Sequence, residues 1–325
     1  MRIVILLSTY NGERWLPALL TSLASQTRPF SVLWRDDGSS DRTRHIMEAE
    51  NRFPLAAIEH SEVGANLGPV GSFAELMAAG LNTAGDAFFL ADQDDVWHPD
   101  KLALMTAHLE AYPPEQAMLA HHDLRVVDEA LVEISPSLWS YMQLTPKLME
   151  LRDFLTRNSV TGCALCVNRA LLQRACPVPL EANMHDWWLG LVASICGKII
   201  AEPAALVDYR QHGTNTLGAK GFFHGLNPFT NWVAGWRRGN AEYRSLFIQA
   251  QALERHSVVR ESASEAQNQL LSQFLALPSL APGSRLKAAM RLGLRHQGGL
   301  LWLVAMLRIA ITAVDLPRNV DPPVL

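Results

Sequence analysis

Two common nucleotide-binding motifs are missing from this sequence of 325 residues, and cysteine is scarce. Neither G-x-G-x-x-G nor G-x-x-x-x-G-K-[ST] occurs, which argues against a Rossmann dehydrogenase and against a P-loop nucleoside triphosphatase. Among the four cysteines, Cys163 and Cys166 form a lone C-x-x-C without a second pair. Because a zinc or redox site needs more than this, we expect buried free thiols in a reducing compartment.

A strong excess of charge of either sign is also missing. The chain has 28 Lys and Arg residues against 32 Asp and Glu residues, and its formal net charge is −4. This balance gives no reason to expect a nucleic acid as a partner. Hydrophobic residues make up 49% of the chain, which is typical of a globular protein with one large domain and an appendage.

Long apolar runs are few. Ile3–Leu7 has only five residues before polar Ser8, so it is too short for a signal peptide and predicts a buried strand. We therefore expect a cytoplasmic protein. Gly298–Val314 has 17 residues, below the ~20 that normally span a bilayer, and Arg308 interrupts it. A charge inside lipid is costly, so this segment is not expected to cross a membrane.

Short apolar runs alternate with amphipathic stretches over the first 120 residues. Strands are predicted at Ile3–Leu7, Ser31–Trp34, Ala56–Glu59 and Ala87–Leu90, and helices at Arg14–Gln26, Arg42–Asn51, Val70–Leu81 and Lys101–Glu110. This alternation predicts an α/β fold in which helices cover both faces of a Rossmann-like, mostly parallel sheet.

The pattern changes in the second half of the chain. A further strand is predicted at Ala164–Val167 and a buried helix at Trp187–Ile195. From residue 216 onward the sequence is predicted to be mostly helical. We therefore divide the chain into a domain at 1–215 and a helical C-terminal extension at 216–325.

Three polar loops follow predicted strands, at Ser8–Asn11, Asp36–Asp41 and Asp92–Asp95. In open α/β sheets, ligands bind at the carboxyl ends of the strands, so these loops are expected to meet at one ligand site. A carboxylate in such a loop can accept hydrogen bonds from ribose hydroxyls or from a base N–H. His121–Asp123 is not expected to bind metal, because adjacent residues on a strand point to opposite sides.

The segment Asp92-Gln93-Asp94-Asp95 crowds three carboxylates at the end of a buried strand. In an extended chain Asp92 and Asp94 point to the same side, and two close carboxylates repel each other unless a cation or a proton joins them. Oxygen ligands suit Mg²⁺ or Mn²⁺, which also bind phosphate oxygens. A solvated acidic turn before the helix that starts at Lys101 is the alternative. A calcium EF-hand is excluded, since Trp97 stands where glycine is required.

The order and spacing of several blocks resemble family 2 glycosyltransferases over about residues 1–215. The blocks are Ser8-Thr9-Tyr10-Asn11 before Trp15-Leu16, Ser25-Gln26-Thr27, Asp36–Asp41, Asn66-Leu67-Gly68, Gly85-Asp86, and Asp92–Asp95 with Pro99-Asp100-Lys101-Leu102. Two further blocks resemble the rhamnosyltransferase-like branch of bacterial surface-polysaccharide synthesis, namely His185-Asp186-Trp187-Trp188 and Tyr209–Asn215.

The resemblance implies a GT-A fold, a nucleoside-diphosphate sugar donor, a Mn²⁺ or Mg²⁺ cofactor and inversion at the anomeric carbon. It also implies donor-binding roles for Ser8, Tyr10, Asn11, Asp37 (the contact to the base), Asn66, Gly68 and Asp92. For the metal it implies Asp92 and Asp94, with Asp94 as the more direct ligand, and His212 as a late histidine that reaches the ion. A histidine satisfied within its own loop is the alternative for His212.

The same resemblance makes Asp186 the catalytic base. A base is required because inverting transfer needs one carboxylate to deprotonate the acceptor hydroxyl. Apolar neighbours would raise its pKa, and a helix N-cap is an alternative role compatible with catalysis. Trp187, Trp188 and Gly162 are candidates for acceptor binding, although core packing is expected for at least one of the two tryptophans.

The expected activity is transfer of a sugar, with L-rhamnose from dTDP-rhamnose as the candidate, onto a glycan or lipid-linked acceptor. The alternatives are a nucleotidyltransferase, whose usual Gly- and Lys-rich phosphate loop is not found, and a non-catalytic protein that binds sugar nucleotides. In the extension, basic residues share a face at Lys287, Arg291 and Arg295. The region 285–314 therefore either lies on the inner face of the plasma membrane or packs against the catalytic domain.

Overall fold

The computed structural model describes residues 1–58, 66–146, 149–212, 232–294, 308–309 and 312. The end of the predicted third strand, the motif residues after His212, Arg295 and most of the apolar stretch 298–314 lie outside this described part.

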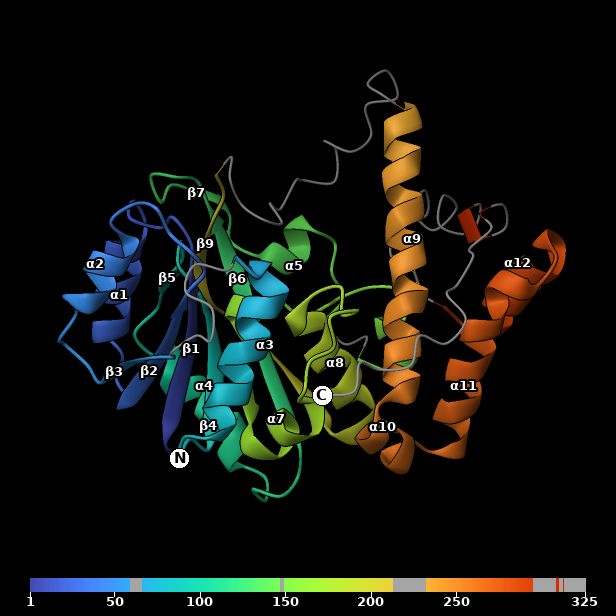
Figure 1. The fold of residues 1–325 in the computed structure, drawn as a ribbon, viewed down its shortest axis with the longest axis horizontal. Coiled ribbons are helices and arrows are strands. Elements are labelled where there is room, and N and C mark those ends of the chain that lie inside the picture. The colour runs from blue at the N-terminus through green and yellow to red at the C-terminus, as the bar shows by residue number, and fades with distance from the viewer. Residues whose placement is uncertain (59–65, 147–148, 213–231, 295–307, 310–311, 313–325) are drawn as a thin grey trace.

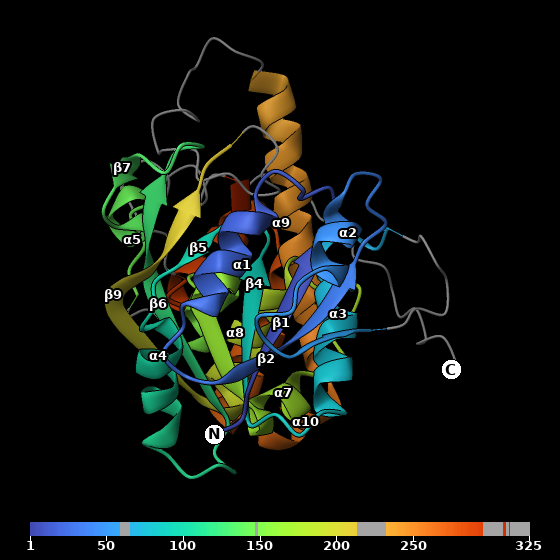
Figure 2. The same cartoon turned by 90° about the vertical axis from the view of Figure 1, so that its left-hand side faces the viewer.

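Within the described residues, a central sheet of nine strands organises the fold (Figures 1 and 2). The strand order is β3-β2-β1-β4-β8-β6-β9-β5, with β7 paired to β6. The four strands predicted in the first half pair in parallel as expected: β1 (Ile3–Thr9), β2 (Phe30–Asp36), β3 (Leu55–Ala57) and β4 (Ala87–Asp92).

The second half of the sheet is mixed. Its strands are β5 (Val96–Trp97), β6 (Met118–Val127), β7 (Glu133–Ser135), β8 (Leu165–Asn168) and β9 (Lys198–Arg210). Strand β8, which the sequence predicts, runs antiparallel to β4 and to β6, whereas β9 runs parallel to β6. The long strands β6 and β9 are not predicted from the sequence.

Helices cover both faces of the sheet, and side chains alternate between them along each strand. In β1, Ile3, Ile5 and Leu7 face one core, while Val4 and Leu6 face the other. The first core is covered by α1 (Leu16–Ala24), α2 (Thr43–Glu48) and α4 (Lys101–Glu110), and the second by α3 (Gly68–Leu81), α7 (Arg169–Ala175) and α8 (His185–Cys196).

Short helical turns connect the later strands. They are α5 (Leu138–Tyr141), α6 (Leu151–Phe154) and the 3₁₀ turn η1 (Gly162–Ala164). Helix α7 is capped by Asn168, whose side chain accepts a hydrogen bond from the backbone N–H of Leu171 at 3.0 Å. The same oxygen accepts one from Met118 at 2.9 Å, which fixes the start of β6 beside β8.

The described part of the C-terminal extension is helical, as predicted. It contains α9 (Trp232–Arg255), α10 (Ser257–Ser262), α11 (Glu265–Ala276), the 3₁₀ turn η3 (Leu277–Ser279) and α12 (Pro282–Arg291). Figure 1 shows these helices stacked on the α8 side of the sheet, with one end of α9 extending beyond the body. Phe247, Phe274 and Leu294 are buried in the same core cluster as Trp188, so this extension packs against the domain.

Arg285 explains why the end of the extension packs in this way. Arg285 is 6% exposed, and its guanidinium donates hydrogen bonds to the carbonyl groups of Pro278, Leu280, Ile309 and Thr312. Arg285 therefore does not belong to the predicted membrane-facing surface at 285–314, because its charge is used inside the fold. No described helix combines the length and the apolar character needed to cross a bilayer.

Candidate active site

A sharp turn at the end of β4 arranges the acidic segment. Strand β4 ends at Asp92. The next two residues, Gln93 and Asp94, form a turn, and β5 begins at Val96. The turn is held by Arg210 at the end of β9. Its backbone N–H donates to Asp95 at 3.2 Å, and its Nε donates to the carbonyl of Asp94 at 2.9 Å.

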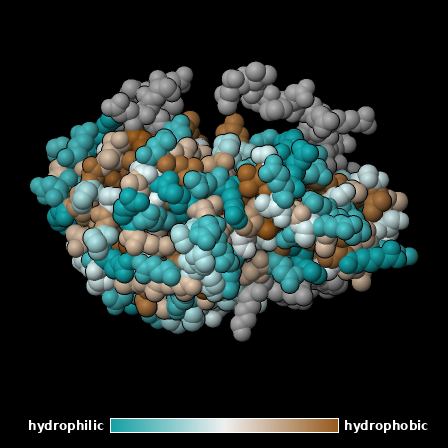
Figure 3. Space-filling model, turned by 90° about the horizontal axis from the view of Figure 1, so that it is seen from below, coloured by the Kyte–Doolittle hydropathy of each residue, from teal (hydrophilic) through white to brown (hydrophobic). Residues whose placement is uncertain are grey.

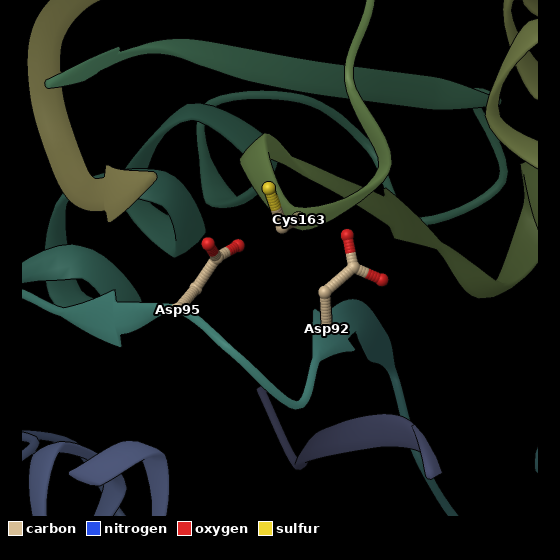
Figure 4. Close-up of side chains that lie close together, drawn as sticks. All are labelled: Asp92, Asp95 and Cys163. Atoms are coloured by element: carbon tan, nitrogen blue, oxygen red, sulfur yellow. The ribbon is translucent and has the colours of Figure 1, made fainter. Parts of the chain in front are cut away.

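This turn brings Asp95 close to Asp92. Asp92, Asp95 and Cys163 each offer a ligand atom, and these atoms lie within 4.8 Å of one another (Figure 4). The backbone turns after Asp92, so Asp92 and Asp94 do not lie on one extended strand, and their joint role as metal ligands stays a prediction. Burial, followed by the charges of Asp94 and Asp186, raises the pKa of Asp92 to about 7. Burial also raises the pKa of Asp95.

Lys101 lies beneath this group at the start of α4. It is fully buried, its Nζ donates to the carbonyl of Cys163 at 2.6 Å, and it lies 3.2 Å from the ring centroid of Trp97. Burial lowers the pKa of Lys101 to about 7. The region therefore holds more potential negative charge than positive charge, which favours a cation or a shared proton between the carboxylates.

Asp94 and His212 form a second part of the site. His212 Nε2 lies 2.7 Å from Asp94 Oδ2, and the imidazole stacks on Trp15 at a centroid distance of 5.2 Å. The guanidinium groups of Arg14 and Arg210 lie 4.0 and 4.6 Å from the centroid of the same Trp15 ring. The structure thus brings two of the three predicted metal ligands into direct contact.

Asp186 lies in the first turn of α8. Its Oδ1 accepts hydrogen bonds from Asn158 Nδ2 at 3.0 Å and from the N–H of Trp187 at 2.6 Å, while Oδ2 accepts from the N–H of Gly162 at 2.8 Å. Burial raises its pKa to about 6 even though these donors lower it. The N-cap of α8 is Met184, so Asp186 is not the cap.

The two adjacent tryptophans have different environments. Trp188 is fully buried and donates from Nε1 to the carbonyl of Ala175 at 2.8 Å. This corrects its prediction as an acceptor contact, because the ring is part of the core. Trp187 is only partly buried and donates to the carbonyl of Phe154 at 2.7 Å. Trp187 and Gly162 lie beside Asp186, and their acceptor roles stay predictions.

The predicted donor residues lie at the carboxyl ends of β1 and β2 and at the start of α3. The backbone N–H and carbonyl of Tyr10 both bond to the side-chain amide of Gln93 at 2.8 Å, which ties the β1 loop to the acidic turn. A Cβ at Gly12 would approach Gln93 Oε1 to 2.2 Å, so any larger residue there would displace the side chain of Gln93 from Tyr10. Asn11 Oδ1 accepts from the N–H of Ser40 at 2.8 Å, so the β1 and β2 loops are joined.

Asp37 is clamped inside the protein rather than exposed. It is 4% exposed, pairs with Arg35, and accepts hydrogen bonds from the N–H groups of Leu67 and Gly68 at 2.8 and 2.9 Å. Asn66 also accepts from Gly68 at 3.0 Å. Gly68 has a φ of +66°, which favours glycine. The base-binding role of Asp37 stays a prediction, and its visible role is to hold the start of α3.

Ser8 and the histidine pair of β6 are also placed by the structure. Ser8 Oγ lies 2.7 Å from Ser72 Oγ, beside the buried Arg35. His121 and His122 are buried, and burial lowers the pKa of both. Neither histidine joins a group of potential metal ligands within the described ranges.

The comparison with known families identifies the chain. "Glycosyl transferase family 2" matches residues 4–173, which is more than half of the 325 residues. The protein belongs to this family. The predicted resemblance to family 2 glycosyltransferases is confirmed, and so is the predicted class of enzyme, a glycosyltransferase.

Curated relatives of this glycosyltransferase are distant. A glycosyltransferase of Nostoc sp., described as uncharacterized, is 27% identical over 228 residues, which are 66% of this chain and 66% of that protein. The dTDP-rhamnosyl transferase RfbG of Shigella flexneri is 25% identical over 234 residues, which are 66% of this chain and 74% of that protein.

Solved structures confirm the GT-A type of fold. Staphylococcus aureus TarS 1–349 in complex with UDP-GlcNAc has a TM-score of 0.56 and 17% identity, covering 85% of this chain and 71% of that chain. The mannosyltransferase PcManGT from Pyrobaculum calidifontis, in complex with GDP-Man and Mn²⁺, has a TM-score of 0.52 and 18% identity, covering 95% and 80%.

Several residues that shape the glycosyltransferase site escaped sequence reasoning. They are Trp15, Arg35, Gln93, Lys101, Cys163 and Arg210, to which the sequence assigns no individual role. Lys101 and Gln93 lie inside two of the sequence blocks that resemble family 2 glycosyltransferases, so their position in the sequence indicated a place near the site. Cys163 carried none, because the sequence gives no hint that β8 enters the sheet beside β4 and brings η1 to the acidic turn.

Proposed function

We propose that this protein transfers a sugar from a nucleoside-diphosphate sugar to an acceptor hydroxyl, with inversion and with a divalent cation. The observation that carries the proposal is that η1 links the two acidic parts: Gly162 donates its N–H to Asp186 at 2.8 Å, and the ligand atoms of the next residue, Cys163, and of Asp92 lie within 4.8 Å of each other. A base and an acidic metal-binding segment are the two parts that inverting transfer requires.

The residues of the site fit a divalent cation. Asp92 and Asp94 offer carboxylate oxygens, His212 offers an imidazole nitrogen, and Oδ2 of Asp95 is buried without a hydrogen-bond partner in the described part of the chain. Oxygen-rich ligand sets of this kind suit Mn²⁺ or Mg²⁺. Such an ion would stabilise the negative charge that develops on the departing diphosphate.

Asp186 acts as the base in this proposal. Asn158, Gly162 and Trp187 donate hydrogen bonds that fix the direction of its carboxylate before the acceptor binds. Its Oδ2 or Oδ1 takes the proton of the acceptor hydroxyl as that oxygen attacks the anomeric carbon. A pKa raised to about 6 makes the carboxylate a stronger base than a solvated aspartate, while it remains mostly ionised at pH 7.

A rhamnosyl donor and a polysaccharide acceptor are the finer part of the proposal. The relative RfbG is described as a dTDP-rhamnosyl transferase, which supports L-rhamnose as the candidate sugar. The two structural neighbours contain UDP-GlcNAc and GDP-Man, so a donor screen has to include uridine and guanosine nucleotides. The acceptor in this proposal is a glycan or a lipid-linked glycan of the bacterial surface.

A position at the inner face of the plasma membrane completes the proposal. Lys287, Met290 and Arg291 are exposed on α12, and Met290 is 57% exposed. A basic and partly apolar face of this kind favours contact with anionic lipids. The described surface seen from below mixes hydrophilic and hydrophobic residues, so that face offers no broad apolar area for a membrane (Figure 3).

Nucleoside diphosphate release tests the proposal. The protein is incubated with UDP-, dTDP- and GDP-sugars and Mn²⁺, with thermal unfolding recorded in parallel, since a true donor raises the melting temperature. Release of a nucleoside diphosphate supports sugar transfer. Release of pyrophosphate from a nucleoside triphosphate and a sugar phosphate would instead support the nucleotidyltransferase alternative. Donor binding without release by any sugar nucleotide would support a non-catalytic protein.

A further inference from the structure

A thiol lies among the carboxylates of the site. Cys163 comes from η1, whereas Asp92 and Asp95 flank the turn after β4, and their ligand atoms lie within 4.8 Å of one another. Figure 4 shows Cys163 placed across from the two carboxylates. Asp95 and Cys163 are fully buried, while Asp92 is partly exposed. An ion can therefore reach this group from the side of Asp92.

The carboxylate of Asp95 is incompletely satisfied. Its Oδ1 accepts from the N–H of Arg210, but Oδ2 is buried and has no partner in the described structure. Lys101 does not fill this role, because its Nζ donates to the carbonyl of Cys163 and packs over Trp97. The only side-chain donor that faces Asp95 in the described structure is the weak S–H group of Cys163. A buried carboxylate with so weak a donor is costly, which points to a ligand that replaces the proton of this thiol.

The chemistry of the group differs from that of an oxygen-only metal site. One sulfur and two carboxylates favour a borderline or soft ion such as Zn²⁺ or Cd²⁺ over Mg²⁺. When such an ion binds, the S–H bond breaks, the sulfur–metal bond forms and the proton leaves to solvent. Two carboxylates and one thiolate then carry a charge of −3, and protonated Lys101 brings the sum to −2, which one divalent cation neutralises.

We propose that Asp92, Asp95 and Cys163 form a binding site for a thiophilic divalent cation, Zn²⁺ or Cd²⁺. This site shares Asp92 with the predicted catalytic metal, so the two ions compete for it. The consequence for catalysis rests on the proposed function: Zn²⁺ or Cd²⁺ inhibits transfer by removing Asp92 from the donor-linked ion. Binding of the thiophilic ion itself does not depend on any activity.

The test uses Cd²⁺ and the full-length protein without donor or acceptor. Cd²⁺ is titrated, and the ultraviolet charge-transfer absorption of a cadmium–thiolate bond is recorded together with proton release. Cys163→Ser is expected to lose the absorption. Cys166→Ser is the matched control, because Cys166 is equally buried three residues away and its Sγ faces the carbonyl of Met105 at 3.9 Å. Cys176 and Cys196 are the same in both variants.

Asp95→Asn keeps every thiol and tests the site independently of the cysteine variant. We expect its apparent Cd²⁺ affinity to fall by at least about tenfold, the range seen when support of a metal ligand is removed. Absence of the absorption in the wild-type protein would overturn the proposal. An absorption in Cys163→Ser equal to that of the wild-type protein would also overturn it. If Cys163→Ser does not fold, an unchanged Cd²⁺ affinity of Asp95→Asn would overturn it. Failure of the sugar-transfer assay leaves these measurements unaffected.

Discussion

The imidazole Nε2 of His212 lies 2.7 Å from Oδ2 of Asp94, although the two residues are 118 positions apart in the sequence. The pairing of β9 with β5 and β6 brings them together, because β9 ends at Arg210 beside the acidic turn. The contact joins the end of the described catalytic domain to the segment predicted to bind metal. Both the metal-ligand role of His212 and the alternative of a histidine satisfied within its own loop stay predictions, since the residues that follow His212 lie outside the described part of the chain.

Asp94→Asn is expected to weaken Mn²⁺-dependent donor binding and to lower turnover, while folding stays largely intact. The substitution removes one charge with little change in shape, and a lost metal ligand costs at least about tenfold in metal affinity. Thermal shift with Mn²⁺ and a nucleoside diphosphate measures binding. Asp100→Asn serves as the control, since Asp100 is exposed and makes no side-chain cap bond. Full wild-type activity in excess chelator would rule out the metal.

Trp15→Ala is expected to raise the Mn²⁺ concentration needed for half-maximal donor binding, because the imidazole of His212 loses the ring on which it stacks. Trp15→Phe keeps an aromatic surface and should retain most of the affinity. If Trp15 acts through His212, the double variant with His212→Gln loses no more than His212→Gln alone. Additive losses would show that Trp15 acts by another route.

Asp186→Asn is expected to bind donor and metal normally and to lose transfer, since only deprotonation of the acceptor is removed. In the wild-type protein, the base works only when ionised, and its pKa is raised to about 6. The rate of transfer should therefore fall as the pH drops below about 6 and reach a plateau above it. The profile is measured at saturating Mn²⁺, because a bound cation favours the ionised form of Asp92. Near-normal turnover of Asp186→Asn would place the base elsewhere.

The two tryptophans after Asp186 should differ in their effect on stability. Trp188→Ala removes a fully buried ring and its hydrogen bond to Ala175, and is expected to cost about 3–5 kcal/mol in the free energy of unfolding. Trp187→Ala should cost less, because Trp187 is only partly buried. Urea unfolding of both variants measures the difference. Equal losses would contradict the assignment of Trp188 alone to the core.

Local patterns were sufficient to predict β1, β2, β4 and the helices between them, because a strand buried on both faces forms a short continuous apolar run and a helix that covers the sheet has apolar residues at helical spacing. They did not predict β6, in which the polar His121, His122 and Asp123 are buried between apolar residues. The candidate roles of Asp186 and His212 came from the family resemblance. Partners such as Trp15 and Cys163 depend on how β8 and β9 enter the sheet, and no local pattern encodes that.

The last prediction concerns the exposed face of α12. Lys287→Glu with Arg291→Glu is expected to reduce binding to anionic liposomes at low salt. Each basic residue near such a surface contributes about 1 kcal/mol, so losing two attractions weakens partitioning roughly 30-fold before repulsion is added. Added salt should weaken wild-type binding in the same direction. Arg44→Glu with Arg260→Glu changes the charge equally on exposed residues of α2 and α10 and is the matched control.

Point variants are preferable here to truncation after Ala281. Truncation would remove the buried residues Arg285, Ala289 and Leu294 and would expose the core that they cover, so loss of liposome binding could reflect unfolding. The charge-reversed pair changes only exposed side chains and should leave the melting temperature within a few degrees of wild type. Equal liposome binding by this pair, by its control and by the wild-type protein would show that α12 only packs against the domain.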